Sequence, residues 1–492
     1  MPNNIAIVGS GFLGMTLALR LAESGAKVTI FESSDRIGGL ASAWTIGDFQ
    51  WDKHYHVTLA SDAFTRRIVE QLGLGDDFRW VETKTGFFTG GKLYSMSDTM
   101  EFLKFPPLGI ISKLRLGATI FYASRQKDWK ALEKVPVDQW LTKLSGKATF
   151  EKIWKPLLLA KLGDAYKRTS AAFIWATIQR MYAARRSGLK KEMFGYVRGG
   201  YARVLERFSE VLISKGVEIR LNSPVDRVER LIDGQVRVTA KSSRRRDDEK
   251  STVLQNAHKK LQETKYSRLR TAVSVAPGFS GMFLSEPRSR NASANYVGRS
   301  STAHSFDQVI LTCPSRAAAE ALPQLSLGEK TSLRSIEYQG IICASVLMKC
   351  PLSNFYVTNI TDEAPFTGVI EMTALVEKKD FGGNSLVYLP KYVAPNDELF
   401  ERTDDEIKSI YLSALEKMYP RFRMKDVLAF KVSRVRNVFP LPVLGYSDTV
   451  PPSKTSIENV FVINSSHIVN GTLNVNETIQ LAERFADELL GS

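Results

Sequence analysis

The chain has 492 residues, of which 43% are hydrophobic and 24% are charged, values ordinary for a globular protein with room for two substantial cores. Its three cysteines form neither a metal-like spacing nor an even set, and no apolar run approaches the ~20 residues of a membrane-spanning helix. About half of the net charge of +15 lies in residues 241–304, which hold 13 Lys and Arg against 5 Asp and Glu and contain no nucleic-acid-binding module. These features exclude a disulfide framework and a spanning helix, and they disfavour nucleic-acid binding. A first strand that begins almost at the N-terminus leaves no room for a signal peptide, so we expect a cytoplasmic protein.

The first predicted element is a short buried strand over Ile5–Val8, followed directly by the spacing G-x-G-x-x-G. In this spacing, Gly9 permits a tight turn and Gly11 lets the backbone approach a pyrophosphate. Gly14 lets the following helix pack against the strand. The pattern predicts a parallel βαβ unit that binds a dinucleotide.

The predicted helix runs from Phe12 to about Ser24, and a second strand covers Lys27–Phe31. The first N–H groups of the helix, around Phe12 and Leu13, would face the phosphates with the positive end of the helix dipole. Glu32 ends the second strand, where a carboxylate can accept hydrogen bonds from ribose hydroxyls.

A second glycine pair, Gly38 and Gly39, follows within the loop from Asp35 to Ala41. A flavin dinucleotide needs close backbone approach here and a cation near its phosphates, which Arg36 could supply; Leu40 and Ala41 complete the loop. The stretch from Ile5 to Ala41 resembles the superfamily of flavin-dependent amine oxidases, protoporphyrinogen oxidases and phytoene desaturases, whose motif continues through R-x-G-G. The resemblance implies FAD. No cysteine or histidine has a recognisable attachment context, so we expect the flavin to be bound without a covalent link.

Two of the five histidines, His54 and His56, flank Tyr55 after a predicted strand. If this segment is extended, both imidazoles lie on one face. Enzymes of the resembling superfamily carry an aromatic or histidine-containing segment here, near the flavin ring. A histidine could donate to a flavin carbonyl or act on a substrate proton, so both are candidate catalytic residues, although two structural histidines remain the alternative. No third ligand is evident, and we expect no metal site.

Helices are predicted from Ser61 to Leu72 and through most of Val135–Arg185, with short strands and a Gly90-Gly91 turn over Phe78–Met96. The apolar stretch Leu108–Ala123, which includes two cations, allows two interpretations. It could lie in a membrane interface or belong to the core of a substrate domain, and the core interpretation is preferred.

The second half resembles the same superfamily at three places. Phe194–Tyr201 marks a return into the cofactor domain, Val225 matches a backbone position that contacts adenine, and Pro314 ends a strand over Phe306–Pro314. Glu371 lies among apolar residues and is a candidate for substrate contact, with a buried ion pair as the alternative.

The resembling enzymes end with a strand, a Gly-Asp pair at the ribityl-phosphate and a helix whose N-terminus faces the flavin. Here Asn464-Ser465 stands where that pair would be, so the Asp charge is missing. Ser465 is assigned to the ribityl-phosphate, and Leu473, Asn474 and Val475 to the start of the final helix. That helix start could stabilise negative charge on a reduced flavin.

Residues 241–304 are polar, basic and without periodicity, and we interpret them as a largely disordered insert. The predicted fold is α/β, with a Rossmann-like FAD-binding domain of parallel sheet and helices and an interleaved α+β substrate domain. The FAD-binding domain comprises residues 1–85, 195–240, 305–321 and 442–492, and the substrate domain comprises residues 86–194 and 322–441.

The predicted function is an FAD-dependent oxidoreductase that transfers hydride from an apolar or amphipathic substrate, such as an amine or a glycan-lipid, to flavin N5. Peripheral membrane contact is allowed. One alternative is a flavin-dependent mutase resembling UDP-galactopyranose mutase. The other is a non-catalytic binding protein on the same fold, resembling the Rab GDP-dissociation inhibitors, against which the intact glycine loops argue.

Overall fold

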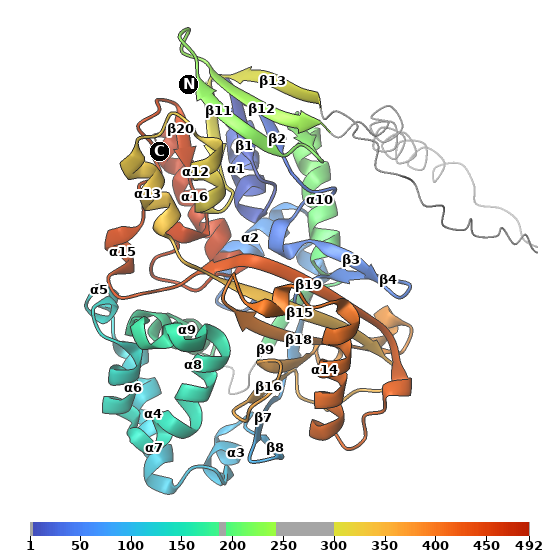
Figure 1. Cartoon of the computed structure of the whole chain (residues 1–492). Coiled ribbons are helices and arrows are strands. Elements are labelled where there is room, and N and C mark those ends of the chain that lie inside the picture. The colour runs from blue at the N-terminus through green and yellow to red at the C-terminus, as the bar shows by residue number, and fades with distance from the viewer. Residues whose placement is uncertain (1–2, 186–192, 243–299, 492) are drawn as a thin grey trace, which may run out of the picture.

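The computed structural model describes residues 3–185, 193–242 and 300–491. A five-stranded sheet, in the order β10-β2-β1-β14-β20, lies at one end of the molecule, with both chain termini close to it (Figure 1). All four strand pairs are parallel. The strands are β1 (Asn4–Val8), β2 (Lys27–Phe31), β10 (Glu218–Arg220), β14 (Gln308–Leu311) and β20 (Val460–Val462). The predicted Rossmann-like sheet is therefore present.

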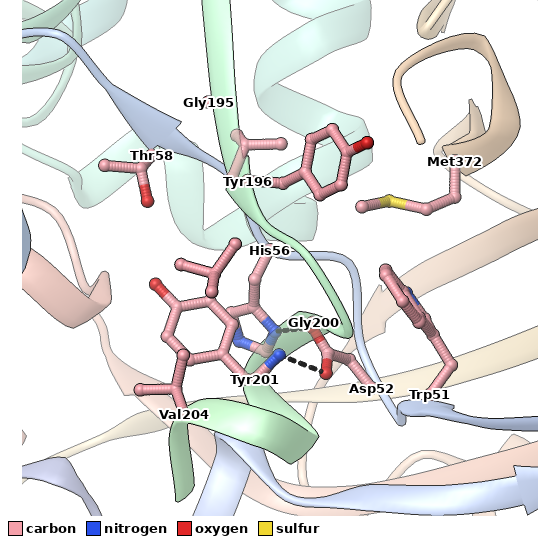
Figure 2. A pocket seen from close by; sticks show the side chains of 12 residues that line it. Trp51, Asp52, His56, Thr58, Gly195, Tyr196, Gly200, Tyr201, Val204 and Met372 are labelled. Atoms are coloured by element: carbon pink, nitrogen blue, oxygen red, sulfur yellow. Dashed lines mark hydrogen bonds and ion pairs between the residues drawn. The ribbon is translucent and has the colours of Figure 1, made fainter. Parts of the chain in front are cut away.

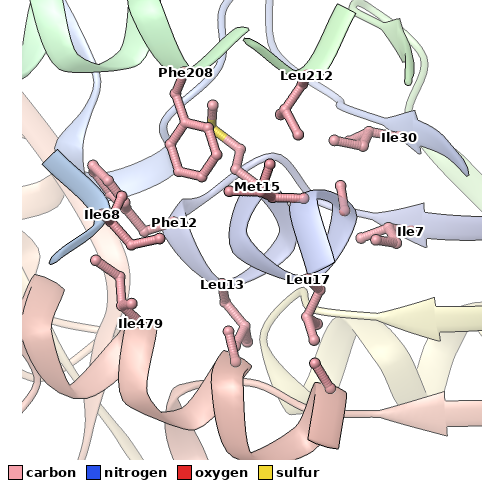
Figure 3. Close-up of a cluster of buried hydrophobic side chains, with 14 of the residues drawn as sticks. Ile7, Phe12, Leu13, Met15, Leu17, Ile30, Ile68, Phe208, Leu212 and Ile479 are labelled. Carbon is pink, nitrogen blue, oxygen red and sulfur yellow. The ribbon is translucent and has the colours of Figure 1, made fainter. Parts of the chain in front are cut away.

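Helix α1 (Phe12–Glu23) joins β1 to β2 and is buried on almost every side. It packs between the sheet, α10 (Gly200–Ser214) and the final helix α16 (Val475–Leu490). Figure 3 shows Leu13 and Leu17 directed toward α16 and Met15 toward Phe208 and Leu212 of α10. Because partners cover opposite faces of α1, its apolar residues do not follow a one-sided helical period.

A three-stranded antiparallel sheet covers one side of this core and corrects the predicted insert. It consists of β11 (Val225–Arg230), β12 (Val236–Ser242) and β13 (Ser300–Phe306). Lys241 pairs with Ser301, and His304 pairs with Val238, so both ends of the predicted 241–304 insert are strand. The polar sequence of β13 suits an edge strand held mainly by backbone hydrogen bonds. Residues 243–299 lie outside the described residues.

The predicted strand over Phe306–Pro314 is also divided. The break falls at Asp307, whose carboxylate accepts hydrogen bonds from the N–H groups of Asn3 and Asn4 and turns the chain from β13 into β14.

A seven-stranded sheet, in the order β19-β15-β18-β17-β16-β7-β8, forms the second large layer. Its strands are β7 (Thr85–Thr89), β8 (Lys92–Ser95), β15 (Tyr338–Met348), β16 (Val357–Ile360), β17 (Gly368–Glu371), β18 (Ser385–Val393) and β19 (Val427–Pro440). Every residue of β15 is buried because its two faces serve two cores. Ile342 and Val346 pack toward α14 (Asp404–Met418), whereas Ile341 and Leu347 pack toward the core that contains Trp51.

Two small sheets connect these layers. The hairpin β3 (Ala43–Ile46) and β4 (Phe49–Asp52) follows the second glycine loop, and β9 (Met193–Val197) pairs with β5 (Thr58–Leu59) and β6 (Phe78–Glu82). The predicted short strands and the Gly90-Gly91 turn between β7 and β8 are confirmed.

The helices predicted within Val135–Arg185 are confirmed, and they gather at the end of the molecule farthest from the parallel sheet (Figure 1). This helical group comprises α3 (Thr99–Lys104), α4 (Ile110–Arg125), α5 (Trp129–Glu133), α6 (Val137–Ser145), α7 (Lys147–Thr149), α8 (Lys155–Leu162) and α9 (Ala171–Arg185). The remaining helices are α2 (Ala63–Gln71), α12 (Ser315–Ala321), α13 (Leu327–Ser335) and α15 (Tyr446–Thr449). None of the helices in the described ranges combines the length and the apolar character that crossing a bilayer requires.

The preferred core interpretation of Leu108–Ala123 is wrong for one face of α4. Leu116 and Ala123 are buried, but Ile110, Leu114 and Phe121 are exposed. An apolar sequence without a polar face cannot show by itself which of its sides is covered.

Candidate functional site

The three glycines of the first loop meet different surroundings. Gly9 has a φ of +110°, which favours glycine, and a Cβ on Gly14 would lie 2.1 Å from the Gly9 carbonyl oxygen. Gly11 has a φ of −67° and a ψ of 173°, which any residue can adopt, and a Cβ there would meet no atom within 4 Å. The protein itself therefore needs glycine at positions 9 and 14, whereas glycine at position 11 leaves open space beside the start of α1.

The second glycine loop closes over the first. Gly38 donates its N–H to the Ser10 carbonyl at 2.9 Å, and a Cβ on Gly39 would lie 3.4 Å from the Gly11 Cα. Gly38 has a φ of +104° and packs against Leu205 of α10. Two glycine-lined backbones thus face each other at the N-terminus of α1, as the predicted pyrophosphate site requires.

Glu32 is buried at the end of β2. One of its carboxylate oxygens accepts from the Ser10 N–H at 2.9 Å and the Ser10 hydroxyl at 2.7 Å, and the other accepts from the Ser34 N–H at 2.9 Å. Burial acts to raise the pKa of Glu32, but these hydrogen bonds outweigh it and lower the pKa. The group is an ionised acceptor at neutral pH, which suits contact with ribose hydroxyls.

Arg36 is held beside the same loops. Its guanidinium forms two bonds with Asp35, at 3.0 and 3.1 Å, and donates to the Ala43 carbonyl at 2.8 Å. The Asp35 carboxylate offsets part of the charge of Arg36. A phosphate bound by Arg36, as predicted, would share the guanidinium with Asp35 and the Ala43 carbonyl.

Most of the predicted cofactor residues lie where strands of the parallel sheet end. Asn222 and Ser223, just before Val225, donate to the Ser34 and Glu32 carbonyls, and Pro314 begins α12 directly after β14. Carboxyl ends of parallel strands are the usual ligand edge of such a sheet. Open space at Gly11, the closing second loop and the acceptor at Glu32 all fit a bound dinucleotide.

The segment after β20 carries Asn464 and Ser465 where the resembling enzymes carry a Gly-Asp pair. Asn464 donates to the Cys313 carbonyl and the Ser315 hydroxyl, and its side-chain oxygen accepts from Ser466, so it ties β20 to the end of β14. Ser465 lines a pocket. The assignment of Ser465 to the ribityl-phosphate stays a prediction, while Asn464 has a structural role.

Helix α16 begins as predicted, with Asn474 as its cap. The Asn474 side chain accepts from the Glu477 N–H, and Asn476 accepts from the N–H groups of Phe64 and Thr65 at the start of α2. Leu473, just before the cap, lines the same pocket as Ser465.

His54 and His56 leave the extended geometry and diverge. The Nδ1 of His54 contacts the Leu40 carbonyl at 3.0 Å, and burial lowers the pKa of His54 to about 4. His54 is therefore neutral at physiological pH, beside the second glycine loop. His56 points into a different pocket, so the predicted common face is wrong.

The pocket around His56 is enclosed between β4, β9 and the start of α10 (Figure 2). His56 Nδ1 lies 3.8 Å from a carboxylate oxygen of Asp52, whose other oxygen accepts from the Tyr201 N–H at 2.9 Å. Burial raises the pKa of Asp52, and His56 acts against this rise. The Tyr201 ring stands edge-on between His56 and Phe12 of α1, which links this pocket to the first glycine loop.

A half-buried lysine lies against Tyr392, the residue that pairs with Tyr55 of the histidine segment. The Nζ of Lys161, in α8, is 3.5 Å from the centre of the Tyr392 ring and 4.9 Å from that of Phe439. The Tyr392 hydroxyl lies 3.0 Å from that of Tyr55. No ion pair joins Lys161 to an acid within the described ranges, and burial lowers the pKa of Lys161 to about 7.

A narrow pocket runs between the helical group and the C-terminal segment. It is lined by apolar residues of α9 and β19, by the polar groups of Glu133 and Tyr446, and by the predicted cofactor residues Ser465 and Leu473. Phe439 belongs both to this wall and to the ring pair beneath Lys161. Phe439 is therefore shared by the pocket wall and the surroundings of Lys161, although Lys161 itself does not line the pocket.

Glu371 lies away from these groups. One of its oxygens accepts from the N–H groups of Leu352 and Ser353, and burial raises its pKa to about 7. No ion pair to Glu371 occurs in the described part of the chain. Glu371 lines neither of the two pockets described above, although the next residue, Met372, lines the His56 pocket. The structure thus supports neither predicted role, and shows a carboxyl group held by two backbone amides.

Sequence reasoning missed Asp52, Lys161, Tyr201 and Tyr392. Their partners lie far away in the chain, and no local spacing marks them. A lysine inside the apolar stretch Leu157–Leu162 was the one available signal, because a lone cation there must be buried or must reach solvent.

Comparison with known proteins agrees with the geometry. Residues 14–254 and 287–490 match the model of the family described as flavin containing amine oxidoreductase. A 15-cis-phytoene desaturase of Glycine max is 30% identical over 129 residues, 26% of this chain and 23% of that protein. A zeta-carotene desaturase of Synechocystis is 24% identical over 262 residues, 48% of this chain and 52% of that protein. The matches thus span about a quarter to a half of these relatives.

Solved structures share the fold over the whole chain. Putrescine oxidase superposes with a TM-score of 0.65 at 16% identity, covering 100% of both chains. Reduced UDP-galactopyranose mutase gives a TM-score of 0.67 at 12% identity, covering 100% of this chain and 96% of the other. At such identities the likeness concerns the fold alone.

Proposed function

The chain belongs to the flavin-containing amine oxidoreductase family, and from this premise we propose that it is an FAD-dependent oxidoreductase acting on an apolar or amphipathic substrate. The main support for a dinucleotide ligand comes from the environment of Gly11. Its backbone conformation and its empty surroundings give the protein no reason of its own for glycine. A ligand that needs the backbone within contact distance supplies that reason.

The residues that would hold FAD follow the edge of the parallel sheet. The backbone at Gly11 and Gly39 and the first N–H groups of α1 would bind the pyrophosphate. Glu32 would accept hydrogen bonds from the ribose, and the start of α16 would lie at the flavin end. Bound flavin supplies an acceptor for the hydride of a substrate C–H bond.

The chain's own residues would bind the substrate and manage its proton. The pocket walls from Phe173, Phe439 and Leu473 favour an apolar body. Lys161 is the candidate to hold a substrate proton, because burial brings its pKa to about 7 and its Nζ lies over the Tyr392 ring, whose hydroxyl pairs with that of Tyr55.

The test compares two glycines of the same loop. Gly11→Val places a side chain in open space at an allowed φ, so the variant should fold as the wild type does while FAD affinity falls by at least about a hundredfold. Gly14→Val brings a side chain onto the Gly9 carbonyl and should reduce folded protein itself. FAD titration with circular dichroism reads both effects, and unchanged FAD affinity in folded Gly11→Val would contradict the proposal.

A further inference from the structure

Exposed apolar side chains are concentrated on one small part of the molecule. Of the seventeen exposed large apolar residues in the described ranges, eight lie between Met100 and Tyr122. We call the outward side of α3 and α4 the α3–α4 face. Seven of the eight, all but Ile120, are its members, given with their exposed fractions: Met100 (60%), Leu103 (50%), Ile110 (76%), Ile111 (76%), Leu114 (65%), Phe121 (56%) and Tyr122 (48%).

The face follows the helical period. Ile110, Leu114 and Phe121 are spaced by four and seven residues, so they form one stripe along α4, with Ile111 and Tyr122 beside it. The opposite side of α4 is covered: Leu116 and Ala123 are buried against neighbouring elements. The stripe is a second apolar side on a helix that already has its core contact, and the protein leaves it without a partner within the described ranges.

Cations lie in α3, in α4 and in the segments beside them, and one of these cations contacts the stripe. Arg125 lies over the Phe121 ring at 5.1 Å, Arg115 donates to the Leu144 carbonyl beside α4, and Lys152 donates to the Pro107 carbonyl between α3 and α4. Lys104 ends α3 and is exposed. Three acids, Asp98, Glu101 and Asp128, lie outside α4, at α3 and at the start of α5, each accepting a backbone N–H.

We propose that the α3–α4 face docks the protein on the surface of a lipid membrane that carries anionic headgroups. Apolar side chains that enter the headgroup boundary, with arginine and lysine beside them, match the chemistry of such a surface. A second copy of this chain fits less well, because a symmetric contact would bring the same cations together. The face lies at the end of the molecule opposite the parallel sheet, so docking leaves the glycine loops uncovered (Figure 1).

Vesicle co-sedimentation of the full chain tests the proposal. Wild-type protein should bind phosphatidylcholine vesicles containing phosphatidylglycerol much more strongly than pure phosphatidylcholine vesicles. Ile110→Ser/Leu114→Ser/Phe121→Ser should weaken this binding by about tenfold or more. The matched control is Ile232→Ser/Leu327→Ser/Leu428→Ser, which removes apolar side chains exposed elsewhere and should bind as the wild type does.

Three results would overturn the proposal. The first is a wild-type protein that binds neither kind of vesicle. The second is an α3–α4 triple variant that binds as the wild type does, which would assign binding to the basic residues 241–304. The third is a wild-type dimer in light scattering that the triple variant converts to a monomer without any vesicle binding, which would assign the face to a second copy. None of these readouts requires flavin, so this test and that of the proposed function fail independently.

Discussion

Lys161 is a cation in a largely apolar environment. Burial places the folded-state pKa of Lys161 near 7, below the ordinary lysine value of 10.5, so the unfolded state binds more protons between these values. Stability therefore rises with pH across that window, and the cost of burying the amine is largest below pH 7. The Tyr392 and Phe439 rings beside the amine favour the ammonium and offset part of this cost.

Lys161→Met should consequently raise the melting temperature more at pH 6 than at pH 9. Lys155→Met, at a position on the same helix where the lysine pairs with Glu151 in solvent, is the control. Equal changes at both pH values in Lys161→Met would show that the amine is charged throughout and does not titrate near neutrality.

Glu371 has the opposite effect on how stability changes with pH. Its folded-state pKa of about 7 lies above the ordinary glutamate value of 4.5, so the folded state retains the proton longer and stability falls as pH rises from 4.5 to 7. Glu371→Gln keeps an acceptor for the Leu352 and Ser353 N–H groups without the charge. Its stability advantage over the wild type should grow from near zero at pH 4.5 to roughly 3 kcal/mol above pH 7.

Denaturant unfolding at pH 5 and pH 8 measures this difference, with Glu363→Gln, at an exposed position, as the control for loss of a carboxylate. An advantage that does not grow with pH would mean that Glu371 ionises in the folded protein at little cost.

At the scale of elements, the strand pair β12–β13 determines which residues of the basic insert can be deleted without loss of a strand. Ser242 pairs with Ser300, so the two strands end side by side and a short Gly/Ser hairpin loop can join them. Replacing residues 243–299 by such a loop should leave the yield of folded protein and its melting temperature close to the wild type. Joining Ala240 to Ser305 instead removes β13, whose His304 ring lies against Phe31, and should lower both. Equal yield from the two deletions would show that β13 contributes nothing to the fold.

For the whole molecule, the parts that could be predicted were local in sequence. The first loop, α1, β2 and Glu32 form one contiguous unit in which each glycine has a distinct steric role, and the same holds for the helix starting at Val475. The covered and uncovered sides of α4 could not be distinguished, because both are apolar and only the packing partners decide between them. The contacts of Asp52 with Tyr201 and of Tyr55 with Tyr392 join residues from separate layers, which no spacing encodes.

The family match leaves the substrate as the least constrained part of the account. The mutase hypothesis shares the fold with the oxidoreductase hypothesis, and net reduction by substrate separates the two. A non-catalytic binding protein on this fold finds no support in the family match.

The most direct measurement of the central claim is the visible absorption spectrum of the purified full-length chain, followed by acid precipitation and identification of the released pigment. We predict a flavin absorption spectrum and the release of FAD at close to one equivalent per chain. Apolar or amphipathic amines and alkenes can then be screened, without oxygen, for compounds that bleach the bound flavin. A colourless protein that also fails to take up added FAD would contradict this prediction.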